Sequence, residues 1–363
     1  MNPAPTDPMG EPAPHSAPIG RRRFLRGAAV VGGGIVVGAS GAELLLRHRD
    51  SDAGHGLAPS GRTVIDPGAF APPGQARVAV LRQTSYDVGL ELVVMQGLKA
   101  IAADVSGANV LLKPNFVEFD ASSAINTDPR LVAAAALAFR RLGAASVTVG
   151  EGPGHRRDTQ FVMESSGLFE ALAGIDVPFV DLNTDAVRAV RLRSSYTDLK
   201  ELWLPDAVSQ ADIVVSMPKM KTHHWAGVTL SLKNCFGCVP GRVYGWPKNA
   251  LHWAGLQQSI LDVAGAVRPD YAIVDGIVGM EGNGPISGTP IPAGLLVFGD
   301  DPVATDVTAA TLMGFDPVKI GYLQEAGRFL GQADPTKIRQ VGEDPQADAK
   351  DFAVLPPFEG MKA

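Results

Sequence analysis

Cysteine, basic charge and long apolar runs are scarce in this 363-residue sequence, and each scarcity excludes a class of protein. Two cysteines cannot form a disulfide framework, and by themselves they cannot hold zinc or an iron–sulfur cluster through four thiolates. Lys and Arg number 32 against 38 Asp and Glu, a net charge of −6, which argues against nucleic acid as a partner. What is present, 45% hydrophobic and 19% charged residues, fits a globular chain with one or two large cores.

One apolar stretch is long enough to meet a membrane, and it lies near the N-terminus. Residues 21–26 read Arg-Arg-Arg-Phe-Leu-Arg, and Glu43 is the only charge in the glycine-rich segment 27–46 that follows. A basic segment before an apolar one is an export signal, and this one resembles the twin-arginine signature. Residues 40–42 (Ser-Gly-Ala) offer a cleavage site. Left uncleaved, the segment would anchor the protein, since twenty helical residues span about 30 Å.

Residues 1–46 are therefore expected to be a disordered N-terminus with an export signal or anchor. The twin-arginine translocon is the expected partner of this segment, which also provides the only membrane contact. The location that follows is extracytoplasmic, in the cell envelope.

After a linker rich in glycine and proline, short apolar runs alternate with segments of helical period. The runs predict strands at Val78–Leu81, Val110–Leu112, Val147–Val149, Ile213–Ser216, Ala272–Val274 and Leu295–Phe298. The periodic segments predict helices at Val88–Ala103, Pro129–Leu142, Gln160–Leu172, Gly255–Val267 and Pro302–Met313. This alternation indicates an α/β fold: a mostly parallel sheet, helices on both faces, and one large or two packed Rossmann-like units. We expect a linker at 47–76, the α/β domain at 77–330 and a surface-wrapping tail at 331–363.

In such sheets, ligands bind beyond the carboxyl ends of the strands. Lys113 and Asn115 follow the second predicted strand, and a Gly-Pro-Gly turn with His155 and Arg156 follows the third. Exposed backbone N–H groups and cations in such a turn suit a carboxylate or phosphate. Together with Lys221 after the fourth strand, Lys113, Asn115 and Arg156 are predicted to bind a small anionic substrate.

The densest polar cluster lies in residues 217–241, where two lysines and two adjacent histidines fall within six residues. Adjacent side chains in an extended segment point to opposite sides, so only one histidine is expected to face a site. We assign His223 to acid–base chemistry and His224, which precedes Trp225, to packing.

Lys233 directly follows an apolar run at 228–232 that reads as buried. A lysine in such a place is costly to desolvate unless it has a partner or a chemical role. When desolvated, it has a lowered pKa and can be a base, a nucleophile or a covalent cofactor anchor. The alternative is that Lys233 marks a strand end and reaches solvent.

Cys235 and Cys238 form a C-x-x-C motif that in an exported protein is either a redox disulfide, half of a metal site, or a pair of small buried residues. The surrounding sequence does not match a thioredoxin-like motif, which favours the structural interpretation.

Four acidic residues near glycine-rich loops are candidates for binding a hard cation or orienting a base: Asp275, Glu281, Asp300 and Asp306.

The order and spacing of these motifs resemble the domain-of-unknown-function 362 family over about residues 77–330. The resemblance rests on Lys113-Pro114-Asn115, on Pro218–His223, on Thr229–Asn234 with Phe236-Gly237, and on Asp275-Gly276 with Met280–Pro285. It implies the fold but no activity. Some members carry ferredoxin-type cysteine sets, which this chain lacks, so an iron–sulfur role does not carry over.

A more distant resemblance is to the nickel-pincer lactate racemases. His223-His224-Trp225-Ala226-Gly227, followed by Lys233, is similar to the segment in which a catalytic histidine precedes the lysine that holds the pincer nucleotide. This resemblance implies a cofactor near Lys233 and Asn234, nickel or another metal at His252, and His155 as the second acid–base group.

The sequence therefore predicts an enzyme of the envelope that performs proton or hydride transfer on a small anionic substrate through His155, His223 and Lys233. The isomerase or racemase class and the oxidoreductase class both fit. The alternative is a non-catalytic metal-binding or redox-accessory protein that uses Cys235 and Cys238.

Overall fold

The structure, a computed structural model, describes residues 74–363 apart from residues 155–157 and residue 193. The predicted export signal, His155 and Arg156 therefore lie outside the described residues. In the part of the chain that is described, no helix has the length and apolar character needed to cross a bilayer.

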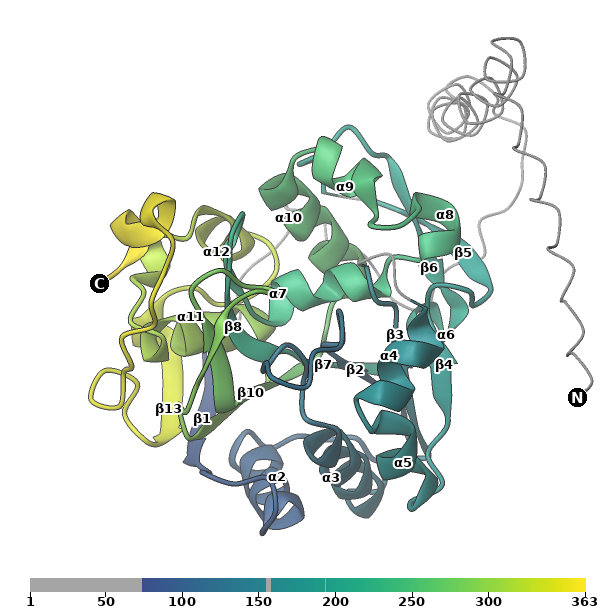
Figure 1. Cartoon of the computed structure of the whole chain (residues 1–363), viewed down its shortest axis with the longest axis horizontal. Coiled ribbons are helices and arrows are strands. Elements are labelled where there is room, and N and C mark those ends of the chain that lie inside the picture. The colour runs from purple at the N-terminus through teal and green to yellow at the C-terminus, as the bar shows by residue number, and fades with distance from the viewer. Residues whose placement is uncertain (1–73, 155–157, 193) are drawn as a thin grey trace, which may run out of the picture. The chain divides into compact units, whose positions relative to one another are not determined.

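An 11-stranded, mostly parallel sheet organises the domain, so the predicted α/β class is confirmed (Figure 1). Its main path runs β13-β1-β12-β10-β7-β2-β3-β4, and along this path only β12 runs antiparallel to its neighbours. The strands of this path are β1 (Ala76–Arg82), β2 (Asn109–Pro114), β3 (Ser146–Glu151), β4 (Phe179–Asp181), β7 (Ile213–Met217), β10 (Tyr271–Glu281), β12 (Leu295–Gly299) and β13 (Ile338–Gly342).

Three more strands extend the sheet from the long strand β10, and two form a separate hairpin. The extension consists of β8 (Lys219–His223), β9 (Gly227–Thr229) and β11 (Thr289–Ile291), and the hairpin consists of β5 (Val187–Arg191) and β6 (Glu201–Pro205). All six strands predicted from apolar runs are present.

The helices are α2 (Leu90–Ala100), α3 (Pro129–Arg141), α4 (Thr159–Ser165), α5 (Leu168–Ala173), α6 (Asp206–Ser209), α7 (Ser231–Asn234), α8 (Gly241–Tyr244), α9 (Asn249–Trp253), α10 (Leu256–Val267), α11 (Pro302–Leu312) and α12 (Gly321–Ala326). Four 3₁₀ segments complete the set: η1 (Cys235–Cys238), η2 (Pro317–Lys319), η3 (Pro335–Lys337) and η4 (Pro356–Met361).

Helices α3 and α11 begin with a capping aspartate and a proline. Asp128 accepts from the N–H of Arg130, and Asp301 accepts from the N–H groups of Val303 and Ala304.

Helices cover both faces of the sheet, and each face has its own core (Figure 1). Side chains alternate between the two cores along each strand: in β2, Leu111 faces one core while Val110 and Leu112 face the other. One core packs α2, α3, α4 and α5, and the other packs α7, α10, α11 and α12. The chain thus forms one doubly covered sheet in its described part.

Three expectations from the sequence differ from the structure. The segment Lys219–His223, expected as a loop, is strand β8, and all five of its residues are buried. The helix predicted over Gln160–Leu172 is two helices, because Gly167, with φ of 77°, starts α5. The C-terminal tail does more than wrap the surface: β13 pairs in parallel with β1, and Phe352 is fully buried.

Candidate functional site

A buried ion pair stands where the carboxyl ends of β2 and β3 meet. Lys113 Nζ lies 2.8 Å from Glu151 Oε1, and each side chain is 1% exposed. Glu151 also accepts hydrogen bonds from the backbone N–H groups of Phe116 and Gly152, at 2.7 and 2.8 Å. The carboxylate therefore accepts from three donors, and it balances the charge of Lys113.

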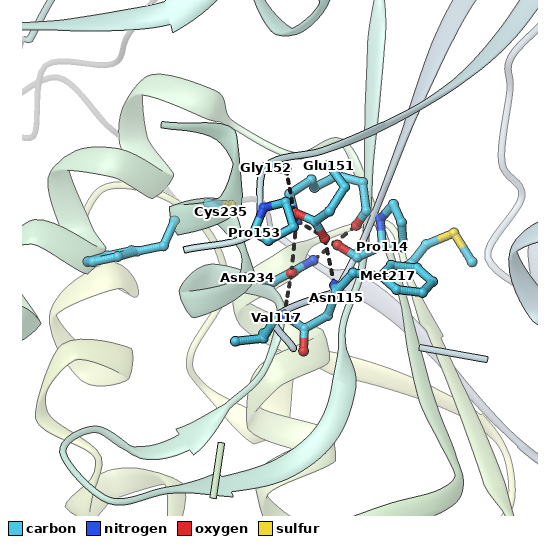
Figure 2. Close-up of polar contacts among 12 residues, drawn as sticks. Pro114, Asn115, Val117, Glu151, Gly152, Pro153, Met217, Asn234 and Cys235 are labelled. Atoms are coloured by element: carbon cyan, nitrogen blue, oxygen red, sulfur yellow. Dashed lines mark hydrogen bonds and ion pairs between the residues drawn. The ribbon is translucent and has the colours of Figure 1, made fainter. Parts of the chain in front are cut away.

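Asn234, at the end of α7, ties this ion pair to the segment that carries Lys233. Its Oδ1 accepts from Lys113 Nζ and from Asn115 Nδ2, at 3.2 and 3.1 Å. Its Nδ2 donates to the backbone oxygen of Lys113 and to Ser216 Oγ, both at 3.0 Å. Figure 2 shows Asn115, Glu151 and Asn234 gathered around this point. All four of these bonds are internal, so a direct contact between Asn234 and a cofactor would break one of them.

The side-chain oxygen of Asn115 lacks a hydrogen-bond partner among the described residues. Its side chain is 7% exposed, and its Oδ1 accepts no hydrogen bond from the described residues. Leaving such an acceptor buried costs free energy, so it is a candidate contact for a ligand.

Lys248 is a further buried lysine at this end of the sheet. Its Nζ donates to the backbone oxygens of Gly152 and Phe236, at 2.8 and 3.2 Å, and the residue is 2% exposed. Burial lowers its pKa to about 7. The two carbonyls stabilise the ammonium only partly, because neither carries a full charge.

Lys233 stands without a carboxylate partner in the described part of the chain. Its half-buried side chain places Nζ 3.9 Å from the centre of the Phe236 ring. Burial, reinforced by the charge of Lys113, lowers its pKa to about 8. Near neutral pH, part of the protein therefore holds this amine in its uncharged, basic form.

His223 ends β8 close to this lysine and is 5% exposed. Its Nδ1 accepts from the backbone N–H groups of Trp225 and Ala226, at 3.0 and 3.2 Å. Because Nδ1 is an acceptor, the ring proton is on Nε2. Burial and the nearby charge of Lys233 hold the pKa of His223 well below its ordinary value. The ring is neutral and presents an N–H donor.

His224, Trp225 and His252 form an aromatic cluster next to His223. Trp225 packs against the ring of His224 at 4.6 Å and against that of His252 at 5.6 Å, both nearly perpendicular. The packing role predicted for His224 thus agrees with the structure, and its Nδ1 lies 2.8 Å from the backbone oxygen of Gly284. In His252, Nδ1 lies 3.2 Å from the oxygen of Lys248, which leaves Nε2 as the nitrogen for a ligand.

Lys221 and Lys219 lie on β8 in different surroundings. Lys221 donates to the backbone oxygens of Ile125 and Pro285, and burial lowers its pKa well below the ordinary value. Lys219 forms an ion pair with Asp275 at 2.7 Å, to which Tyr86 also donates at 2.7 Å. The Lys219 charge is balanced, whereas that of Lys221 is not.

The predicted acidic candidates all have protein partners. Asp275 pairs with Lys219 and Asp300 with Arg77, while Glu281 accepts from the N–H of Ala353. Asp306 accepts from the first two N–H groups of α7, at 2.7 and 2.9 Å, and burial raises its pKa to about 8. Asp306 therefore fixes the helix that carries Lys233 and Asn234.

Cys235 and Cys238 are buried thiols, 1% and 0% exposed. Their burial agrees with the structural interpretation, since a thiol that exchanges with a redox partner must be accessible. Across residues 74–363, leaving aside 155–157 and 193, no three His, Cys, Asp or Glu side chains are grouped as metal ligands. His252 is thus a predicted metal ligand that belongs to no such group in the described part.

Two members of this site were not predicted from the sequence. Glu151 carried a usable signal, because it follows a predicted strand beside the one that Lys113 follows, and neighbouring parallel strands bring such ends together. No sequence signal points to Lys248, because only folding brings the carbonyl groups of Gly152 and Phe236 close to it.

A family model described as Domain of unknown function (DUF362) matches residues 110–311. A thylakoid-associated protein of Synechocystis sp. is 31% identical over 254 residues, which cover 67% of this chain and 76% of that protein.

Two solved structures show weaker likeness. The lactate racemase apoprotein of Thermoanaerobacterium thermosaccharolyticum matches with a TM-score of 0.44 and 14% identity, over 68% of this chain and 59% of that one. A structural-genomics protein of Thermotoga maritima matches with a TM-score of 0.33 and 10% identity, over 55% of this chain and 52% of that one. The chain therefore spans less than two thirds of either structure.

Proposed function

The chain belongs to the family described as Domain of unknown function (DUF362), and from its site we propose that it is an enzyme that moves a proton on a small anionic substrate. One observation carries the proposal: a basic lysine without a carboxylate partner in the described residues, Lys233, lies near a neutral histidine donor, His223.

The unpaired lysines of the site favour an anionic ligand. Glu151 pairs with Lys113, whereas Lys221, Lys233 and Lys248 form no ion pair with a carboxylate of the described residues. Because burial makes each ammonium costly, an anion that enters would stabilise the charged forms and bind tightly for that reason. Arg156, outside the described residues, is the further cation predicted for this role.

Lys233 is proposed as the base. With a pKa of about 8, its amine is a useful proton acceptor at neutral pH, whereas an ordinary lysine is almost fully protonated. In the proposed step, a proton leaves the carbon next to a carbonyl and binds to Lys233 Nζ. The electron pair of the C–H bond forms a carbon–carbon double bond, and the π pair of the carbonyl moves to its oxygen, which gives an enolate.

His223 is proposed to stabilise that oxygen. Two backbone donors hold its Nδ1, so Nε2–H is available as a hydrogen-bond donor rather than as a base. This refines the role predicted from the sequence, in which His223 exchanges protons directly. His155 stays the predicted group for the opposite side of the substrate.

A cofactor or metal at this site is a further part of the proposal. If a cofactor is attached to Lys233, it would be held through Nζ, which would then no longer act as the base, and His252 would offer Nε2 to a metal ion. Asn234 would support such a group by fixing the end of α7, since its own hydrogen bonds are already made.

Calorimetry tests the anion site. Pyruvate should bind the wild-type protein at pH 8 with proton uptake, seen as a difference in heat between buffers of unlike ionisation enthalpy, because a bound anion raises the lowered pKa values of Lys221 and Lys248. Lys233→Met should weaken binding at least tenfold, while Lys99→Met, an exposed control, should bind as wild type. Equal binding by all three proteins would contradict the proposal.

Proton transfer has its own readout. In D₂O the wild-type protein should exchange the methyl protons of pyruvate, followed by NMR. Lys233→Arg keeps a cation but loses the base, so it should bind pyruvate and exchange none. His223→Phe, which lacks the donor, should exchange at least tenfold more slowly. Exchange by Lys233→Arg at the wild-type rate would exclude Lys233 as the base.

Export by the twin-arginine route belongs to the same proposal. It is supported by residues 21–26 and by the thylakoid association that the name of the Synechocystis relative states. Replacing Arg21 and Arg22 with lysines should leave the folded protein in the cytoplasm, as cell fractionation would show. Export of that variant at the wild-type level would contradict the route.

A further inference from the structure

A groove of about 510 Å³ opens on the outer side of Trp225 and is not used by the proton-transfer site. Its lining comes from the turn between β8 and β9 and from the loop between β10 and β11: His224, Trp225, Asn283, Ile286 and Ser287. We call it the outer groove. Its volume is in the range of sites that hold small organic molecules.

The two walls of the outer groove are fixed to each other. The backbone N–H and the Nδ1 atom of His224 both lie within hydrogen-bond distance of the Gly284 oxygen, at 2.9 and 2.8 Å. Thr222 Oγ1 donates to the oxygen of Gly282 at 2.9 Å. A Cβ on Gly284 would overlap the backbone of Thr222, so glycine lets the walls approach. The groove is therefore preformed and binds without a large ordering cost.

The lining of the outer groove selects a neutral, hydroxylated ring. It contains no Lys, Arg, Asp or Glu side chain, in contrast to the lysine-rich site behind it. Trp225 is 61% exposed and offers a broad apolar surface, which Ile286 extends. Asn283 and Ser287 are exposed and offer an amide and a hydroxyl at the edge. A pyranose ring has apolar C–H faces and a rim of hydroxyls, which match this combination.

Trp225 connects the outer groove to the proton-transfer site. The same indole that lines the groove packs 5.6 Å from His252 and 6.5 Å from His223, measured between ring centres. The outer groove and the histidines of the proton-transfer site thus share this indole. We propose that the outer groove binds the pyranose ring of a sugar acid whose carboxylate reaches the lysine site. This inference rests on the proposed function and adds the substrate class.

Calorimetry with D-glucuronate and pyruvate tests this inference. Glucuronate should bind at least tenfold tighter than pyruvate, because the ring adds contacts in the outer groove. Trp225→Ala and Asn283→Ala should remove that advantage, and Asn283→Ala should leave pyruvate affinity within twofold of wild type. Trp253→Ala is the matched control, since Trp253 is 80% exposed and does not line the groove. All three residues are exposed, and equal melting temperatures would verify that the variants fold.

The outcomes separate the two proposals. Glucuronate binding no tighter than pyruvate, or unchanged glucuronate binding by Trp225→Ala, overturns the sugar inference and leaves the anion site standing. Phenylpyruvate binding tighter than glucuronate also overturns it, because the groove would then select an aromatic ring. Failure of the wild-type protein to bind any of these acids overturns the proposed function, and the sugar inference with it.

Discussion

Lys113 and Lys233 lie at the same end of the sheet, yet their surroundings give them different roles. Lys113 has Glu151 at 2.8 Å and is held by Asn234, whereas Lys233 has only an aromatic ring against its Nζ among the described residues. A balanced buried charge is structural, and an unbalanced one is available to a ligand. The charge of Lys113 also lowers the pKa of Lys233, so the paired lysine tunes the unpaired one.

Glu151→Gln tests the structural role of the ion pair. The change leaves the buried charge of Lys113 without its partner, and we expect the free energy of unfolding to fall by about 3–5 kcal/mol. Glu343→Gln is the control, because its pair with Arg82 is partly exposed and should contribute less than about 1 kcal/mol. Urea unfolding measures both variants. Similar losses in the two would show that burial does not set the strength of the Lys113 pair.

Lys248 should make stability depend on pH above neutrality. Its pKa is about 7 in the folded protein and about 10.4 in the unfolded chain. Between these values the unfolded chain holds a proton that the folded protein lacks, so stability rises with pH across this window. Lys248→Met should reduce that slope, with the lowered pKa values of Lys221 and Lys233 maintaining the rest. Lys99→Met is the control and should keep the wild-type slope of stability against pH. Denaturation at pH values from 7 to 10 measures the slope of each variant. A wild-type slope in Lys248→Met would contradict the assignment.

At the scale of elements, the sequence predicts best where local pattern and final burial agree. The central strands are apolar, β-branched runs, and the structure places all six of them. Strand β8 was missed because Lys219 and Lys221 read as polar loop residues. Their burial depends on Asp275 and on the carbonyls of Ile125 and Pro285, which are far away in the chain. Such long-range partners are invisible to a local pattern.

The candidate site, too, could be predicted only where a local pattern identifies a residue. Lys233 was predicted because it follows an apolar run, His223 because it lies in the dense lysine–histidine cluster, and Lys113 because it follows a predicted strand. The tautomer of His223 was not predictable, since it depends on the turn that brings the N–H groups of Trp225 and Ala226 to Nδ1.

Segment η1 lies directly against the ion pair, and Gly237 makes this possible. A Cβ at Gly237 would overlap the end of the Lys113 side chain and lie 2.5 Å from Glu151 Oε1. Gly237→Ala should therefore lower stability by about 1–3 kcal/mol and weaken pyruvate binding by shifting α7. Gly174→Ala is the control, because that glycine is in a helical conformation with no atom within 4 Å of its Cβ. It should change stability by less than about 1 kcal/mol. Equal thermal midpoints for both variants would exclude the close approach.

At the scale of the whole molecule, the C-terminal segment completes the sheet. Strand β13 covers the outer edge of β1, and Ile338 is 7% exposed there (Figure 1). Without it, the hydrogen-bonding groups of β1 would be open to other chains.

Ile338→Asp tests this contribution. An unpaired charge placed in the core should lower stability by about 3 kcal/mol or more and promote aggregation. Its neighbour Arg339 is exposed, so Arg339→Asp should behave as wild type. Thermal unfolding and gel filtration compare the two, and a wild-type profile for Ile338→Asp would show that the sheet is stable without this edge.

The position of β1 between β12 and β13 also constrains when the protein can fold during its synthesis. Both neighbours of β1 emerge from the ribosome long after it, because β12 begins at Leu295 and β1 ends at Arg82. At a translation rate of about 5–20 residues per second, β1 waits about 10–40 s for its first partner. The nascent chain therefore carries an unpaired apolar strand through most of its translation. Chaperones that cover β1 on the ribosome would protect the protein until the last strands are made.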